Sequence, residues 1–408
     1  MVRRKIYPSS HWSKTPLTHV LGPLQEFINR SASSAVVLML AALIALLLAN
    51  SPFAETYDAV LHTDIGVSVG PLVLKESVLH WINDGLMAIF FFLVGLEIKR
   101  EVRVGELSSI RVALLPLIAA LGGAVIPALI YTGLNFGGSG AAGWGIPMAT
   151  DIAFAVGGLV LLGNRVPLAL KIFLTAVAIV DDLYAVLVIA VFYSSNINFA
   201  ALAIGFGVLG VLILANLFGI RTIPFYVTLG LVVWLAFLQS GVHATIAGVL
   251  VAWTIPARNR INALTFLERS RGILRRFEDR PLKSKRMLTD EEQQCAVIEL
   301  EEVCEQVQAP LQKLEHSLGP WVSFLILPLF ALGNAGVALS LDNVAGETST
   351  IALGIIMGLV LGKPIGLIGA SWLAVRLGLA SIPRGIRWQH MIGVGCLAGI
   401  GFTMSIFI

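Results

Sequence analysis

The chain has 408 residues, of which 57% are apolar or aromatic and only 13% are charged. Soluble globular domains carry about 25% charged residues, so this composition excludes an ordinary soluble enzyme and a disordered chain. A net charge of +3 gives no reason to expect a nucleic-acid partner, and three cysteines provide neither a disulfide framework nor metal-ligand spacing. The composition is typical of a polytopic membrane protein.

Eleven apolar runs have about the length that crosses a roughly 30 Å hydrocarbon layer as a helix. We therefore predict an all-α membrane protein with about 11 transmembrane helices. The first run is too long for the apolar core of a signal peptide and should be a membrane anchor. The predicted spans lie near 33–52, 80–98, 112–132, 144–162, 167–193, 199–218, 223–239, 242–257, 320–340, 350–375 and 388–408.

The basic residues alternate between successive loops. Twenty-six of the 28 Lys and Arg residues lie in the N-terminal tail and in the even-numbered loops or at their edges. Because cytoplasmic loops are enriched in Lys and Arg, the N-terminus is predicted to be cytoplasmic. The predicted domains are a cytoplasmic tail (1–32), spans 1–8 (33–257), a cytoplasmic charged loop with an amphipathic helix (258–319) and spans 9–11 (320–408).

The loop between the first two spans, 63–75, alternates apolar with small residues and turns at Gly70-Pro71. Such alternation predicts a short outer β-hairpin, with an irregular ordered loop as the alternative.

The loop 258–319 is basic in its first half and acidic in its second. Thr289 with Glu292 forms a capping-box pattern, and Pro310 should interrupt the helix that follows. Two interpretations stay open. The loop could be a basic element on the anionic inner leaflet followed by a regulatory or self-pairing helix, or it could be ordinary positive-inside charge with a solvated helix. The predicted apolar seam is Val297, Leu300, Cys304, Val307, Leu311 and Leu314.

Four ionisable side chains lie deep inside predicted spans, namely Asp151, Asp181, Asp182 and Lys363. Each costs about 2.5–3.5 kcal/mol at a helix centre. Four unpaired groups would therefore cost on the order of 10–14 kcal/mol, comparable with the stability of a whole domain. They must be paired with one another, or bound to ions or water.

Asp181 and Asp182 are neighbours in an apolar helix, and successive helical residues point about 100° apart. The two carboxylates should therefore face different partners. A buried carboxylate holds either a proton or a small cation, and competition between these at one site is the chemistry of cation/proton exchange; a fixed structural salt bridge is the alternative. Lys363 is the natural partner of a deep aspartate, and a buried lysine can also give up its proton.

Two glycine-rich segments, 145–151 and 399–403, interrupt predicted spans. Broken helices expose carbonyls and helix ends at membrane depth, where they can coordinate ions. Asp151 would offset the partial positive charge of helix N-termini there; simple kinks are the alternative. His243, near the outer end of span 8, is either a packed side chain or a proton-sensing group.

These segments resemble the bacterial NhaA-type sodium/proton antiporters over about residues 25–256 and 314–408. The resemblance implies that family's inverted-repeat fold, with two broken helices that cross. The matching stretches are VGLEIKRE (94–101), MATDIAFA (148–155), AIVDDL (178–183), SGVHAT (240–245), GKPIG (362–366) and GIGFTMSIF (399–407).

The resemblance also implies residue roles. Asp182, with Thr150 nearby, would be the main sodium or lithium site, Asp181 would pair with Lys363 and exchange protons, and Asp151 would balance the helix ends. The outer hairpin would be the contact of a homodimer. A cytoplasmic-face cluster would set the response to pH, with His243 as a further candidate; its members are Glu97, Arg100, Glu101, Glu315 and His316.

The implied activity is electrogenic export of Na⁺ or Li⁺ driven by proton entry at the bacterial inner membrane, without a cofactor and without enzyme catalysis. The alternative is a cation channel or another ion-coupled secondary transporter. A channel could also use buried carboxylates, but it would not exchange protons obligatorily. An intramembrane serine protease using Ser139 is a poorer match, since Ser139 falls in a polar loop.

Three features depart from the family pattern. The loop 258–319 is longer than expected, and Tyr184 stands where a glycine is expected. The chain stops at Ile408, where we expect the family to continue to a twelfth span.

Overall fold

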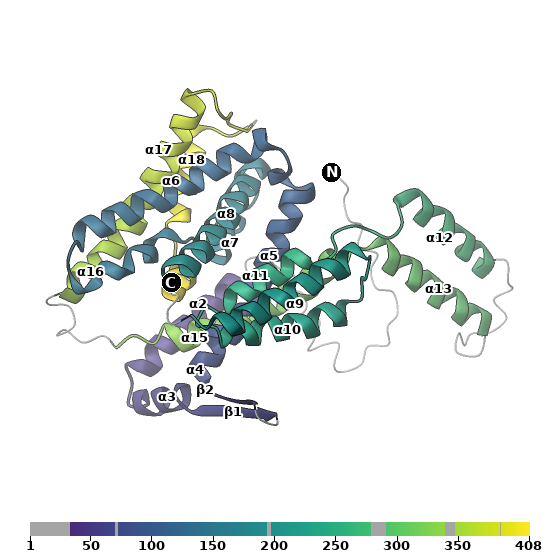
Figure 1. Cartoon of the computed structure of the whole chain (residues 1–408). Helices are drawn as coiled ribbons and strands as arrows, with labels where there is room; N and C mark the ends of the chain where they lie inside the picture. Colours follow the sequence, from purple (N-terminus) through teal and green to yellow (C-terminus); the bar gives the residue numbers. More distant parts are fainter. Residues whose placement is uncertain (1–32, 70–71, 194–196, 279–290, 339–346, 384) are drawn as a thin grey trace.

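The computed structural model describes residues 33–69, 72–193, 197–278, 291–338, 347–383 and 385–408. These residues are mostly helical, and each of the eleven predicted spans contains a helix (Figure 1). The predictions for the N-terminal tail, the Gly70-Pro71 turn and the capping pattern at Thr289 fall outside the described residues.

Seven helical segments of the described chain are long and apolar enough to cross a membrane, or eight if one bent pair counts as a span. That pair, α2 (Ser33–Ala49) and α3 (Ala54–Leu61), bends by 117° near Pro52, which disfavours helix at the residue before it. The seven segments are Val78–Val104, Val112–Leu134, Gly140–Leu161, Leu168–Phe192, Phe199–Leu217, Pro310–Asn334 and Ser349–Arg376.

The other predicted spans lie in shorter helices. Among them, α10 (Ile223–Leu238) has 16 residues, which give a length of about 24 Å at roughly 1.5 Å per residue. The helices α11 (Thr245–Thr254), α18 (Trp388–Ala398) and α19 (Phe402–Phe407) are shorter still. Hydropathy thus located these segments correctly, and the break between α18 and α19 falls in the glycine-rich segment 399–403 predicted to interrupt this span.

The predicted β-hairpin is confirmed. Strand β1 (Asp64–Val69) pairs antiparallel with β2 (Leu72–Ser77), in a register that sets Asp64 opposite Ser77. The Trp81 Nε1 donates a hydrogen bond to the carbonyl of Ile65 at 3.0 Å, which ties the hairpin to the helix that follows it. We call this end of the molecule the hairpin end.

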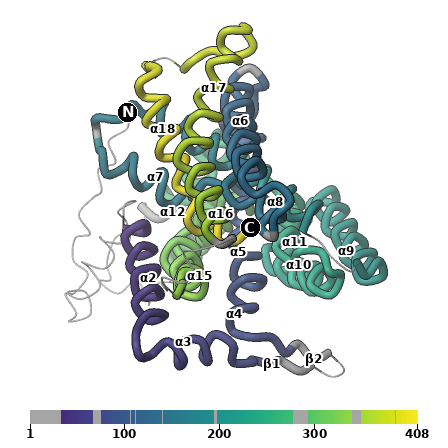
Figure 2. Tube along the Cα trace, turned by 90° about the vertical axis from the view of Figure 1, so that its left-hand side faces the viewer, coloured from purple at the N-terminus to yellow at the C-terminus, as the bar shows by residue number. Residues whose placement is uncertain are grey.

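The helices α6 (Ile110–Leu134) and α17 (Lys363–Arg376) pack along one another, with α16 (Glu347–Met357) beside them (Figure 2). Small residues permit this approach, because a Cβ atom on Gly366 would overlap the carbonyl oxygen of Gly122. The contact fixes the start of α17, where Lys363 lies.

We predict that Gly366→Ala lowers thermal stability, by about 1–3 kcal/mol as is typical of overpacking. Gly369→Ala is the matched control on the same helix, since its Cβ would meet nothing within 4 Å, and alanine is the better helix former by roughly 1 kcal/mol. Thermal unfolding of both purified variants should give shifts of opposite sign. A Gly366→Ala variant as stable as the parent would contradict the packing argument.

Two prolines account for irregular turns inside spans. Pro328 in α15 (Leu327–Asn334) and Pro364 in α17 have no N–H to donate. Each follows a π-helical turn, η6 (Val322–Ile326) and η8 (Gly358–Gly362) respectively. Such turns absorb the missing hydrogen bond and occur often at functional sites; η8 leads directly into Lys363.

The loop 258–319 forms two helices, α12 (Ala263–Glu278) and α13 (Glu291–Val307), that pack through Ile273, Ala296 and Val303. Pro310 begins the next helix, α14 (Pro310–Trp321), so the predicted interruption is confirmed. The predicted seam is wrong at Val297, which is 43% exposed. Its neighbour Ala296 faces α12 instead, and a helical period alone could not choose between two adjacent apolar residues.

The remaining elements complete the chain order. They are α4 (Val78–His80), η1 (Trp81–Leu86), α5 (Met87–Val104), η2 (Glu106–Ser108), η3 (Ser139–Met148), α7 (Ile152–Leu161), η4 (Gly163–Arg165), α8 (Leu168–Phe192) and α9 (Phe199–Leu217).

Candidate ion-binding site

The two adjacent aspartates of α8 are enclosed by protein. Asp181 is 2% exposed and Asp182 is fully buried. The helix is apolar around them, so nothing on α8 itself compensates their charge. Their partners must come from other helices.

Asp181 has two partners from distant parts of the chain. The Nζ of Lys363, itself fully buried, lies 2.8 Å from Asp181 Oδ2. The hydroxyl of Thr150 lies 2.6 Å from the same oxygen. Lys363 also donates to the carbonyl of Met148. The structure therefore brings Lys363 and Thr150 to Asp181 rather than to Asp182.

Asp182 lacks such compensation. Among the described residues neither of its carboxylate oxygens has a hydrogen-bond partner, and Asp181 Oδ1 has none either. Buried polar atoms are nearly always hydrogen-bonded, and an unpaired buried charge is costly. Unsatisfied carboxylate oxygens on two neighbouring residues of α8 therefore suit a hard cation, which prefers oxygen ligands, or a proton.

Beside this pair, two interrupted helices cross. The backbone is extended at Ala149 and Asp151, between η3 and α7, and α18 gives way to α19 at 399–401. The Asp151 N–H donates to the carbonyl of Ile400 at 2.8 Å. The predicted breaks thus meet through a backbone hydrogen bond.

Asp151 joins the N-termini of both broken helices. Its Oδ1 accepts from the N–H of Phe154 at 3.1 Å in the first turn of α7. Its Oδ2 accepts from the N–H of Thr403 at 3.2 Å, and from the Thr403 hydroxyl, at the start of α19. A carboxylate in this position offsets the partial positive charge of two helix ends. The sequence predicts Asp151 at this position but gives no signal for Thr403.

The residues predicted to respond to pH separate into two clusters. Arg100 lies 2.9 Å from Glu101 and also pairs with Glu315. Glu97 and His316 are close enough to interact electrostatically with Glu315. These five residues, contributed by α5 and α14, form what we call the arginine cluster.

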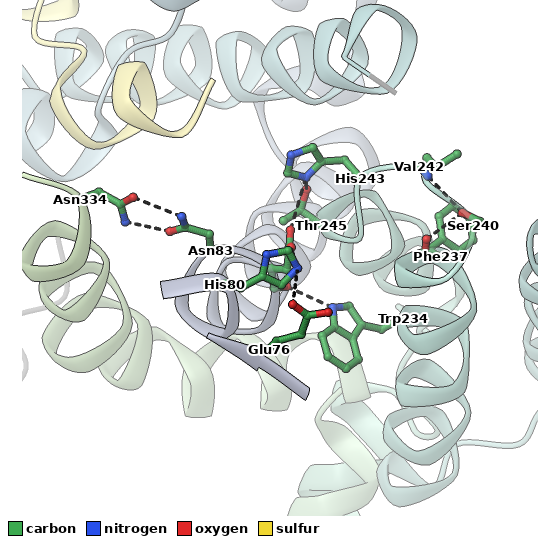
Figure 3. A network of polar contacts seen from close by, with 11 residues as sticks. Glu76, His80, Asn83, Trp234, Phe237, Ser240, Val242, His243, Thr245 and Asn334 are labelled. Atoms are coloured by element: carbon green, nitrogen blue, oxygen red, sulfur yellow. Dashed lines mark hydrogen bonds and ion pairs between the residues drawn. The ribbon is translucent and has the colours of Figure 1, made fainter. Parts of the chain in front are cut away.

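His243 lies at the hairpin end instead. Its Nδ1 is 3.7 Å from Asp84, whose carboxylate also lies 2.8 Å from the Nε2 of His80. Figure 3 shows this group beside the reciprocal amide pair of Asn83 and Asn334. Asp84 precedes Arg100 by 16 residues, about 24 Å along a helix, so His243 is remote from the arginine cluster.

Lys99 is a buried cation that the sequence did not single out. It is 5% exposed, and its Nζ donates to the carbonyls of Trp253 and Ile255, both at 2.5 Å, at the end of α11. A cation there satisfies open helix carbonyls and the negative end of the helix dipole. In the sequence Lys99 is indistinguishable from positive-inside charge. Tyr184 is half-buried and packs on the apolar cluster around Phe173 and Leu174.

The model of the family described as Na⁺/H⁺ antiporter 1 matches residues 25–408. The chain belongs to the Na⁺/H⁺ antiporter 1 family. Antiporters of this family are transporters rather than enzymes; they need no cofactor, and their substrates are ions.

Relatives of this Na⁺/H⁺ antiporter 1 family member match nearly all of the chain. Na(+)/H(+) antiporter NhaA 1 of Saccharophagus degradans is 49% identical over 98% of this chain and 86% of its own length. Na(+)/H(+) antiporter NhaA of Oleidesulfovibrio alaskensis is 49% identical over 96% of this chain and 87% of its own. The protein of the same name from Sulfurimonas denitrificans is 47% identical over 95% and 87%.

Proposed function

We propose that this protein exchanges Na⁺ or Li⁺ for protons across the bacterial inner membrane, with Asp182 as the main ion ligand. One observation carries the proposal. Both oxygens of Asp182 and Oδ1 of Asp181 are buried without hydrogen-bond partners among the described residues, beside the Asp181–Lys363 ion pair. The names of the relatives, Na(+)/H(+) antiporter, support the same substrates.

Charge balance at this site gives the proposed stoichiometry. In the proton-loaded state Asp182 is protonated and Asp181 is paired with charged Lys363, so the site is neutral. In the sodium-loaded state both carboxylates bind Na⁺ and Lys363 has released its proton, so the site carries one negative charge. One Na⁺ then replaces two protons, and each cycle moves one net positive charge inward.

Alternating access is assigned to the crossing of the broken helices. Thr150 and Asp151 lie in one extended segment, and Asp151 is held by the start of α19. Non-helical backbone lets two helix ends shift without breaking a continuous hydrogen-bond ladder. Movement of this crossing would therefore expose Asp182 to the two sides in turn, while Asp151 keeps the helix ends neutral.

Three further assignments belong to the proposal. The arginine cluster sets the pH at which transport begins, with His243 contributing at the hairpin end. The β-hairpin is the contact of a homodimer, and the N-terminus is cytoplasmic, which is supported by the distribution of Lys and Arg between the loops.

The test uses purified protein in Na⁺-loaded liposomes that contain a pH dye and equal K⁺ on both sides. On dilution into Na⁺-free medium we expect internal acidification, as Na⁺ leaves and protons enter. Valinomycin should accelerate it, because K⁺ movement dissipates the potential created by unequal charge exchange. A cation channel would behave oppositely, since valinomycin would abolish the potential that draws protons in. Acidification unaffected by valinomycin would refute the electrogenic stoichiometry.

A further inference from the structure

The helix α12 has two faces with different surroundings. One packs on α13, where Ser270 and Ile273 are 8% and 5% exposed. On a helix with about 100° between successive residues, a second face carries Leu264, Leu267 and Leu274. These leucines are 72%, 46% and 46% exposed, so the described chain leaves a large part of each side chain uncovered.

The arginines of α12 divide between the same two sides. Arg269 donates to Gln306 at 3.1 Å, and Arg276 forms an ion pair with Glu299, so both are committed to α13. Arg271 and Arg275 lie among the exposed leucines and have no ion-pair partner among the described residues. The whole helix contains four arginines and two glutamates, Glu268 and Glu278, so α12 carries a net charge of +2.

Backbone hydrogen bonds fix the base of the helical pair formed by α12 and α13. The N–H of Arg260 donates to the carbonyl of Gln306 at 3.0 Å, and the N–H of Leu311 donates to the carbonyl of Pro256 at 3.2 Å. Thus α12 begins close to the end of α11, and α13 ends close to Pro310, where a span-length helix begins. Figure 1 shows the two helices projecting from the bundle beside these ends.

We propose that the leucine–arginine face of α12 docks on the anionic lipid surface of the protein's own membrane. Exposed leucines are unfavourable in water, but they are stabilised when a helix lies in the interface with its apolar side chains below the headgroups. Arg271 and Arg275 would then meet anionic headgroups, which attract basic segments next to a span. A second copy of this chain fits less well, because each copy would bring the net positive charge of its own α12 into the contact.

The experiment places a fluorophore on this face in the full chain reconstituted in liposomes. Leu267→Cys is labelled with bimane in a background lacking the native cysteines (Cys295→Ser, Cys304→Ser, Cys396→Ser). Glu301→Cys, on the exposed polar side of α13, is the matched control. Spin-labelled lipid reports contact with the bilayer, in vesicles of phosphatidylcholine alone or with about one third phosphatidylglycerol.

We expect spin-labelled lipid to quench the label at 267 in anionic vesicles, and to quench it less in neutral vesicles or high salt. The label at 301 should be unaffected. Adding Arg271→Glu and Arg275→Glu should reduce quenching at 267 to the control level, whereas Arg271→Lys with Arg275→Lys should retain it. Equal quenching at both positions, or quenching independent of anionic lipid, would overturn the proposal. Shielding at 267 that depends on protein density would identify a second copy instead. None of these readouts requires transport, so failure of the antiport assay would leave them interpretable.

Discussion

Asp182→Asn is expected to abolish Na⁺-driven acidification of proteoliposomes, down to the rate of protein-free vesicles. The amide keeps the shape of the side chain but can neither carry a negative charge nor release a proton. Both competing ions therefore lose their main ligand, whose two oxygens are otherwise unpartnered among the described residues. Asp58→Asn is the control for the same substitution, since Asp58 is exposed on α3.

The same variant gives a second readout that does not depend on transport. A ligand at one hundred times its Kd stabilises the state that binds it by about 2.7 kcal/mol. Na⁺ should therefore raise the unfolding temperature of the parent protein but not that of Asp182→Asn. An Asp182→Asn variant that still exchanges Na⁺ for protons would remove Asp182 from the mechanism.

The second large effect is on stability. Lys363→Met should destabilise the protein by about 3–5 kcal/mol, because removing one partner of a buried ion pair leaves an uncompensated charge. Here that charge is Asp181, whose Oδ2 lies 2.8 Å from Lys363 Nζ. Thermal or denaturant unfolding in detergent measures the difference from the parent.

The double variant Asp181→Asn with Lys363→Met tests the pairing in a double-mutant cycle. With both charges removed, most of the lost stability should return, because replacing a buried ion pair by neutral groups is often nearly neutral. A double variant no more stable than Lys363→Met alone would show that the two residues do not act as a pair.

Part of this site was predictable from the positions of charged residues in the sequence. Asp181, Asp182 and Lys363 stand out because charged residues in apolar runs are rare and must be compensated. Their exact pairing was not predictable: Thr150 was expected near Asp182, but its hydroxyl lies against Asp181. The contact of Thr403 with Asp151 spans 252 residues and depends on how two broken helices cross, which no local pattern encodes.

The fold, like the site, was predictable from the sequence only in part. Hydropathy found the helices of the apolar runs, because burial in lipid is a property of a run of residues, but it did not find α3, which lies outside every predicted span. It could not find the end of α11, where Lys99 and Asn216 donate to main-chain carbonyls from other helices. Those side chains allow a helix of ten residues to stop among its neighbours.

The distance along the chain between Asp181 and Lys363 matters during biosynthesis. The lysine follows the aspartates by about 180 residues, which at roughly 5–20 residues per second corresponds to about 10–40 s of translation. During this interval α8 is available to the insertion machinery while the cation that neutralises Asp181 in the finished protein has not yet been synthesised. The aspartates are thus synthesised before the lysine, and the Asp181–Lys363 ion pair of the finished protein can form only after α17 has been made.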